Sequence, residues 1–159
     1  MTNRELALRF CAFRHYSDED YRKYQSLDAF LVEYTRRIDG CSEQAPPLTD
    51  KDLKKLKADF KRAMENAYEV MGKAAFRRWP LTQTRRGPIN RAVFESQAVA
   101  LADYPLDKLL QKKDEIVKAF RQAFDDRIYS SAVTVGTGAP AAVESRLRHT
   151  KSILAKSIR

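Results

Sequence analysis

Apolar residues recur three and four positions apart over most of this chain, which is the spacing of one face of an α-helix. The longest such run follows Thr49-Asp50-Lys51-Asp52, a segment with the spacing of a helix-capping box. Its apolar positions are Leu53, Leu56, Phe60, Met64, Ala67 and Met71. The same periodicity predicts helices over residues 3–16, 17–24, 26–39, 49–72, 90–101, 105–124 and 140–157.

Glycine and proline separate these helical segments. Gly40 and Pro46-Pro47 mark a loop over residues 40–48, and Pro80 and Pro88 enclose a second loop over residues 79–89. Residues 129–141 contain two glycines, a proline and little charge, which also favours a loop. No segment alternates convincingly enough to predict a strand. We therefore expect one all-α domain over residues 1–159, built as an irregular bundle of six or seven helices.

Composition narrows the class of protein. The chain has 159 residues, of which 43% are hydrophobic and 32% charged, as in a folded soluble protein. Its apolar runs are too short to span a membrane, and the first residues lack the apolar core of a secretory signal. Cys11 and Cys41 have neither metal-ligand spacing nor a disulfide pattern. We expect a cytoplasmic protein that does not act at a membrane; assembly with identical chains is left open.

Positive charge is concentrated in the middle of the chain. Residues 51–91 carry 12 basic and four acidic side chains, which accounts for +8 of the net charge of +9. Six of these basic residues flank the only tryptophan, Trp79, and we take them as candidates for binding nucleic acid: Lys73, Arg77, Arg78, Arg85, Arg86 and Arg91.

Three interpretations of this segment remain open. In the first, Trp79 belongs to the core and the arginines bind helix ends or face solvent. In the second, the segment contacts a partner chain. In the third, the arginines bind phosphates while Trp79 stacks on a base.

Candidate catalytic chemistry is sparse. His15 and His149 are far apart in sequence and have no ligand-spaced partners, so no metal site and no cofactor are predicted. Gly136-Thr137-Gly138 precedes a predicted helix, where Thr137 is a candidate phosphate contact. Glu95 lies in the first turns after Asn90, and we expect it to form a structural ion pair with Arg91 or Arg86 rather than to act as a general base.

Three blocks of the chain resemble a known family. Residues 3–13 (NRELALRFCAF) are similar to its segment (D)RELVLRFLAF, and residues 27–31 (LDAFL) to its segment (M)DDFLN. Residues 85–95 (RRGPINRAVFE) are similar to RRPINKALFE. These segments occur in the helical downstream half of the GmrSD-type restriction subunits (domain of unknown function 262), whose upstream half is a ParB/sulfiredoxin-like catalytic domain.

The resemblance does not extend to the catalytic residues of that family. Its Asp-Gly-Gln motif is absent here, since Asp39-Gly40 is followed by Cys41. The chain thus resembles a separately encoded helical half or an excised fragment.

The resemblance implies a non-catalytic helical subunit of a restriction-like, antiviral defence system, which binds a ParB-like catalytic partner and contributes a basic surface facing DNA. We expect no activity from the isolated chain. The alternative is that Asn90, Glu95 and Thr137 form half of a composite nucleotide-hydrolysing or nuclease site that a partner chain completes.

Overall fold

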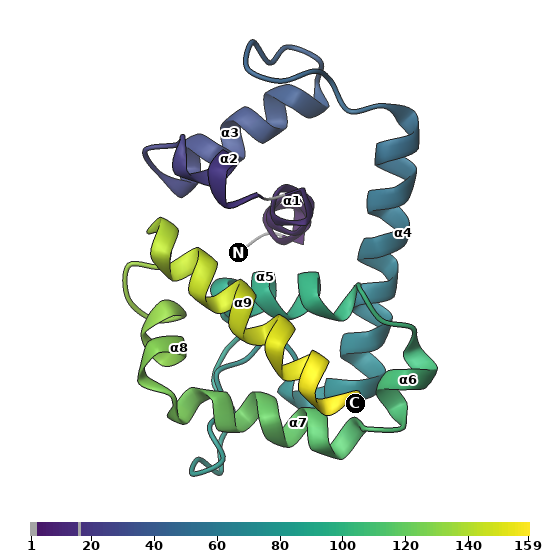
Figure 1. Cartoon of the computed structure of the whole chain (residues 1–159), viewed down its shortest axis with the longest axis vertical. Coiled ribbons are helices and arrows are strands. Elements are labelled where there is room, and N and C mark those ends of the chain that lie inside the picture. Colours follow the sequence, from purple (N-terminus) through teal and green to yellow (C-terminus); the bar gives the residue numbers. More distant parts are fainter. Residues whose placement is uncertain (1–2, 16) are drawn as a thin grey trace.

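The computed structural model describes residues 3–15 and 17–159, and every regular element within them is helical. The all-α prediction is therefore confirmed, as an irregular arrangement of helices (Figure 1). The α-helices are α1 (Asn3–Arg14), α2 (Asp18–Arg22), α3 (Leu27–Ile38), α4 (Asp50–Asn66), α5 (Arg91–Leu101), α6 (Leu106–Leu110), α7 (Lys113–Gln122), α8 (Arg127–Ala132) and α9 (Pro140–Ser157). A π-helical turn, η1 (Ala67–Met71), and a 3-10 turn, η2 (Gly72–Ala74), extend α4, and a second 3-10 turn, η3 (Ala123–Asp125), extends α7.

Helix α5 is the centre of the fold. It is buried along its whole length after Arg91, from Ala92 to Leu101. Helices α9, α1 and α4 all pack against it, and Figure 1 shows α9 crossing α5 with α4 to one side. A helix that is buried on all faces needs neighbours on all faces, which explains why its polar side chains bind other parts of the protein.

Several helix starts that the sequence indicates are confirmed. Thr49 and Asp52 form a reciprocal capping box at α4, and the Ser26 side chain accepts a hydrogen bond from the amide of Ala29 at α3. Asn90 caps α5, its side-chain oxygen accepting from the amide of Val93 at 3.0 Å. Each cap satisfies an amide that the helix itself leaves unpaired.

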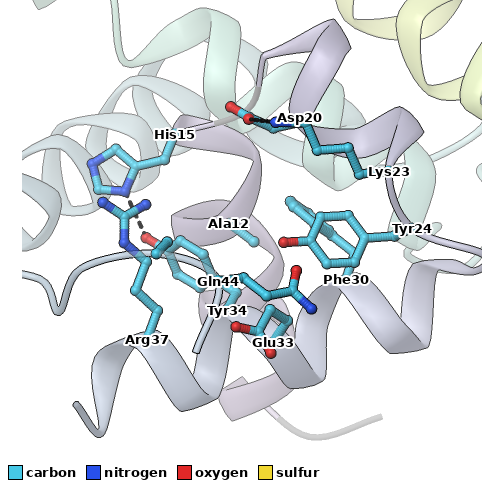
Figure 2. A pocket seen from close by; sticks show the side chains of 11 residues that line it. Ala12, His15, Asp20, Lys23, Tyr24, Phe30, Glu33, Tyr34, Arg37 and Gln44 are labelled. Atoms are coloured by element: carbon cyan, nitrogen blue, oxygen red, sulfur yellow. Dashed lines mark hydrogen bonds and ion pairs between the residues drawn. The ribbon is translucent and has the colours of Figure 1, made fainter. Parts of the chain in front are cut away.

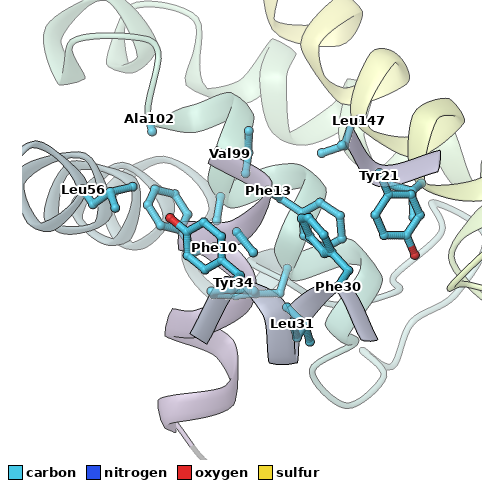
Figure 3. Close-up of a cluster of buried hydrophobic side chains, with 14 of the residues drawn as sticks. Phe10, Phe13, Tyr21, Phe30, Leu31, Tyr34, Leu56, Val99, Ala102 and Leu147 are labelled. Atoms are coloured by element: carbon cyan, nitrogen blue, oxygen red, sulfur yellow. The ribbon is translucent and has the colours of Figure 1, made fainter. Parts of the chain in front are cut away.

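The core consists of three adjoining clusters. The first is aromatic, with Phe13, Tyr21 and Phe30 in mutual ring contact between α1, α2 and α3 (Figure 3). The second joins the end of α4 to α7 and α9, and the third joins α5 to α8. Phe76 packs against the first two clusters and Ile153 against the last two, so the clusters are continuous.

The end of α4 differs from the expected continuous helix. The α-helical hydrogen bonding ends at Asn66, whose side-chain Nδ2 donates to the carbonyls of Leu101 and Tyr104 at 2.8 and 2.9 Å. The chain then passes through the π-turn η1 to Gly72, which has a φ of +50°. This left-handed conformation is one that glycine adopts without steric cost.

Two further expectations need correction. The single helix predicted over residues 105–124 is divided into α6 and α7, because Lys112 adopts φ −121° and ψ 21° between them. The predicted loop 129–141 begins inside α8, which Asp126 caps by accepting hydrogen bonds from the amides of Ile128 and Tyr129. The predicted end of the first helix at residue 16 lies outside the described residues, and α1 ends at Arg14.

Among residues 3–15 and 17–159, no helix is both long enough and apolar enough to cross a bilayer.

Candidate nucleic-acid interface

The segment between η2 and α5 is an irregular hairpin over residues 76–90. Its two sides are antiparallel, with an isolated bridge between Arg77 and Ile89. The amide of Asn90 donates to the carbonyl of Phe76 at 2.8 Å, and the amide of Gly87 donates to the carbonyl of Arg78 at 3.2 Å. Figure 1 shows this hairpin projecting beyond α7. The loop predicted over residues 79–89 is thus a hairpin whose sides begin a few residues earlier.

Gly87 is required where the two sides of the hairpin meet. A Cβ atom at this position would lie 3.0 Å from the carbonyl oxygen of Arg78. Since that contact is with backbone, a larger residue would push the two sides apart.

Phe76 begins the hairpin in a strained conformation. Its φ of +61° is unusual for a residue with a side chain. The buried Gln97 of α5 accepts a hydrogen bond from the Phe76 amide at 2.8 Å, and the rings of Phe76 and Phe94 meet edge to face at 4.8 Å. Helix α5 therefore sets the direction in which the hairpin leaves the bundle.

Arg121 of α7 holds the hairpin from the other side. Its Nε donates to the carbonyl of Trp79 at 3.1 Å, and its Nη2 donates to the carbonyls of Pro80 and Gln83 at 3.1 and 3.3 Å. Its guanidinium also lies over the Trp79 ring. The indole Nε1 in turn donates to the carbonyl of Gln83 at 2.9 Å. One arginine thereby fixes the turn that begins at Trp79.

This role of Arg121 has no signal in the sequence, because the residue lies 42 positions beyond Trp79 and has the spacing of an ordinary helix-surface cation. Only the packing of α7 beneath the hairpin brings the two residues together.

The candidate basic residues fall into two groups. Lys73, Arg85, Arg86 and Arg91 are exposed, whereas Arg77 and Arg78 are half-buried. Arg77 donates to the carbonyl of Gly87 at 2.9 Å, which ties the two sides of the hairpin together. The Nε of Arg78 is buried without a hydrogen-bond partner among the described residues.

Carboxylates neutralise only one of these six residues within the described part of the chain. Arg91 lies 3.2 Å from Glu5, while no ion pair involves Lys73, Arg77, Arg78, Arg85 or Arg86. Arg77 and Arg78 lie on one side of the hairpin and Arg85 and Arg86 on the other. The hairpin therefore presents positive charge that no carboxylate neutralises among the described residues.

Glu95 occupies a different position from the one expected. It is fully buried and binds Arg9 of α1 and Arg146 of α9, so its predicted pairing with Arg91 or Arg86 is wrong. The two partners of Glu95 are 86 and 51 residues away in the sequence. The structural role predicted for this carboxylate is kept, with different arginines.

The ion pairs continue outward from Glu95 to the surface. Arg9 also binds Glu5 at 3.0 Å, and Glu5 binds the exposed Arg91. Burial alone would lower the pKa of Arg9, but the charges of Glu95 and Glu5 outweigh it and raise that pKa, so Arg9 stays protonated. The network links α1, α5 and α9 and ends at the base of the hairpin.

The other two candidates for a composite site have structural contacts of their own. The Asn90 side chain caps α5 and donates to the carbonyl of Val133 at 3.0 Å. The carbonyl of Thr137 accepts a hydrogen bond from Arg146. Arg146 thus bridges Glu95 and Thr137, and it does so with its side chain only 1% exposed.

The two histidines lie apart. His15 contacts the Tyr34 hydroxyl at 2.8 Å, and His149 stacks on the Tyr129 ring at a centroid distance of 4.7 Å. Burial lowers the pKa of both imidazoles. Within the described part of the chain, no three histidine, cysteine or carboxylate side chains gather in a way that would hold a metal ion.

No protein-family model, no curated protein and no solved structure matches the chain.

Proposed function

We propose that the 76–90 hairpin binds the phosphate backbone of nucleic acid, DNA in the first instance. The observation that carries this proposal is the exposure of Arg85 and Arg86 on a projecting, anchored hairpin with no carboxylate partner among the described residues. Guanidinium groups bind phosphate oxygens through paired hydrogen bonds, and a cluster of them gains further from the release of counterions.

In this proposal the Trp79 ring does not stack on a base. Arg121 covers one face of its ring at 4.1 Å, and the ring also packs against the second core cluster. Among the three interpretations of the segment, the contacts favour a partly buried Trp79 combined with phosphate-binding arginines. Recognition of phosphate rather than of stacked bases implies binding with little sequence preference.

The wider role we propose is that of a non-catalytic helical subunit in a restriction-like defence system. It rests on the resemblance of three sequence blocks to the GmrSD-type subunits and on the absence of their Asp-Gly-Gln motif. In this proposal a ParB-like catalytic chain binds the helical subunit, and the hairpin helps to hold DNA for it. A neighbouring gene that encodes the missing motif would supply the chain with which to test assembly.

The alternative of a composite nucleotide site receives less support from the geometry. Glu95 is 0% exposed and is bound by two arginines, so it offers no accessible carboxylate to a metal ion or to water. Nucleotide turnover by an assembled complex that Glu95→Gln abolishes, without loss of folding, would favour the alternative.

The experiment that tests the proposed function is binding to a short DNA duplex over a range of salt concentrations. Neutralising Arg85 and Arg86 together is compared with neutralising two exposed lysines of α4, Lys54 and Lys57, which changes the net charge by the same amount. If DNA binding is weakened in the arginine double variant and not in the lysine double variant, the result supports the hairpin as the binding surface.

A further inference from the structure

A pocket of about 190 Å³ lies at the C-terminal end of α1, the end away from Glu5. It is lined by the end of α1, by α2, by α3 and by the loop after α3 (Figure 2). A volume of this size holds about six water molecules and is smaller than the pockets that take drug-sized ligands. It fits a molecule with a single ring.

The loop wall of this pocket is well fixed. The Ser42 hydroxyl donates to Glu33 and accepts hydrogen bonds from the amides of Gln44 and Ala45, both at 3.1 Å. The amide of Leu48 donates to the carbonyl of Arg37 at 3.4 Å. The pocket is therefore formed by anchored segments and not by a loose turn.

Some of the polar groups around the pocket are already engaged. Lys23 pairs with Asp20 at 3.1 Å, and Glu33 binds Ser42 and lies 3.6 Å from Arg36. His15 and the Tyr34 hydroxyl are bonded to each other. These groups line the pocket but already have hydrogen-bond or ion-pair partners.

Three groups have hydrogen-bonding capacity left. Arg37 uses its Nε to donate to the carbonyl of Pro46 at 2.8 Å, which leaves both terminal nitrogens without a partner among the described residues. The hydroxyl of Tyr24 and the side-chain amide of Gln44 are likewise without a hydrogen bond in that part of the chain. In Figure 2 the Tyr24 hydroxyl and the Gln44 amide point into the pocket, and the Arg37 guanidinium lies at its other side, next to His15.

The charges favour a ligand with a single negative charge. Lys23 and Arg37 balance Asp20 and Glu33, and burial lowers the pKa of His15, which keeps the imidazole neutral at neutral pH. Arg37 is the only one of these charged groups without an ion-pair partner among the described residues. A carboxylate matches the two parallel donors of its guanidinium, whereas a dianionic phosphate would also be repelled by Asp20 and Glu33.

The body of the ligand is indicated by the apolar lining. Phe30 and Tyr24 form an edge-to-face pair at 5.2 Å, and Ala12 and Ala45 leave the wall smooth. Such a lining favours a flat ring. We infer that this pocket binds a small aromatic monocarboxylate, with its carboxylate on Arg37 and a polar ring substituent on Tyr24 or Gln44. This inference is independent of the proposed nucleic-acid function.

The test uses 4-hydroxybenzoate as the probe and the full chain, with binding followed by calorimetry and by NMR shifts. We expect saturable binding with shifts confined to α1, α2, α3 and residues 39–48. The neutral 4-hydroxybenzamide should bind at least about tenfold more weakly, because it loses the charge match with Arg37. The dianionic phenyl phosphate should also bind more weakly, because Asp20 and Glu33 repel its second charge.

Variants assign the contacts. Arg37→Gln should weaken the binding of 4-hydroxybenzoate by about tenfold or more. Arg148→Gln, which removes an exposed arginine of α9, should leave this binding unchanged. The wild type should prefer 4-hydroxybenzoate over benzoate, and Tyr24→Phe combined with Gln44→Ala, which removes both candidate partners of the ring hydroxyl, should abolish that preference. Absence of saturable binding to the folded wild-type chain would overturn the inference. So would binding that Arg37→Gln and the Tyr24→Phe, Gln44→Ala double variant both leave intact, or equal binding of the carboxylate and the amide.

Discussion

The guanidinium of Arg121 lies 4.1 Å from the centre of the Trp79 ring while it donates hydrogen bonds to the carbonyl of Trp79 itself. The same side chain reaches the carbonyls of Pro80 and Gln83. Because no ion pair involves Arg121 among the described residues, its charge adds to that of the hairpin instead of cancelling it. A single helix residue thus both positions the hairpin and contributes to its positive potential.

Replacing Arg121 should loosen the hairpin while leaving the bundle folded. In Arg121→Lys the positive charge remains, but the planar fork that reaches three carbonyls is lost, so we expect the free energy of unfolding to fall by about 1–2 kcal/mol. Trypsin should cleave after Arg85 and Arg86 faster than in the wild type. Limited proteolysis with mass spectrometry measures this effect.

The matched control for that variant is Lys118→Gln, an exposed position on the same helix. It should leave both the cleavage rate and the stability unchanged. Equal cleavage of the wild type and Arg121→Lys would show that the hairpin does not depend on this anchor.

Glu95 should be the most sensitive position of the buried ion network. Glu95→Gln leaves Arg9 and Arg146 buried without their shared counter-charge, which we expect to cost about 3–5 kcal/mol of unfolding free energy. Chemical denaturation measures this loss. The partly exposed Glu5→Gln should cost about 1 kcal/mol or less, since water can replace it.

A rescue variant distinguishes a structural carboxylate from a catalytic one. Pairing Glu95→Leu with Arg146→Met removes one charge of each sign and should restore part of the stability that Glu95→Gln loses. Wild-type stability in Glu95→Gln would contradict the account of the network.

Some helix boundaries can be predicted from the local sequence and others cannot. Caps such as Ser26 and Thr49 act on amides two or three residues away, so their effect is contained in the local sequence and the prediction was confirmed. Helix α8 was missed because Ser130, Ser131 and Ala132 have little periodicity. It forms where Tyr129 is buried against α5 and α9, a contact between distant segments.

The candidate site divides in the same way. The presence of a positively charged loop follows from neighbouring residues, so it could be predicted from the sequence. Its hairpin form and its start at Phe76 could not, because they depend on backbone pairing between its two sides. The partners of Glu95 could not be predicted, because α5 is buried on all faces and its periodicity does not indicate which distant arginines contact it. The anchor Arg121 was missed for the same physical reason.

The stability of the fold should fall as the pH drops below about 6.5, the usual pKa of histidine. Burial, with a contribution from Lys156, lowers the pKa of His149 in the folded chain despite the opposing charge of Asp126. The unfolded chain therefore binds more protons in this range, so acidification favours unfolding until the pH falls below the folded pKa. Burial lowers the pKa of His15 as well, with the same sign.

His149→Phe tests how much His149 contributes to this loss of stability at low pH, because the variant keeps a ring stacked on Tyr129 but removes the titrating nitrogens. Thermal melts between about pH 7.5 and pH 5.5 should show a shallower loss of stability in this variant than in the wild type. An NMR titration that places the His149 pKa above 6.5 would refute the prediction.

The most direct test of the account is the salt dependence of binding to a 20-base-pair duplex of arbitrary sequence. If Arg85 and Arg86 each contact a phosphate, Arg85→Gln with Arg86→Gln should weaken binding at low salt and reduce the slope of log K against log[salt] by about two. The Lys54→Gln, Lys57→Gln control, with the same net charge, should keep a slope close to that of the wild type. Equal losses in the two double variants, or no loss in either, would contradict the claim that the hairpin binds the phosphate backbone.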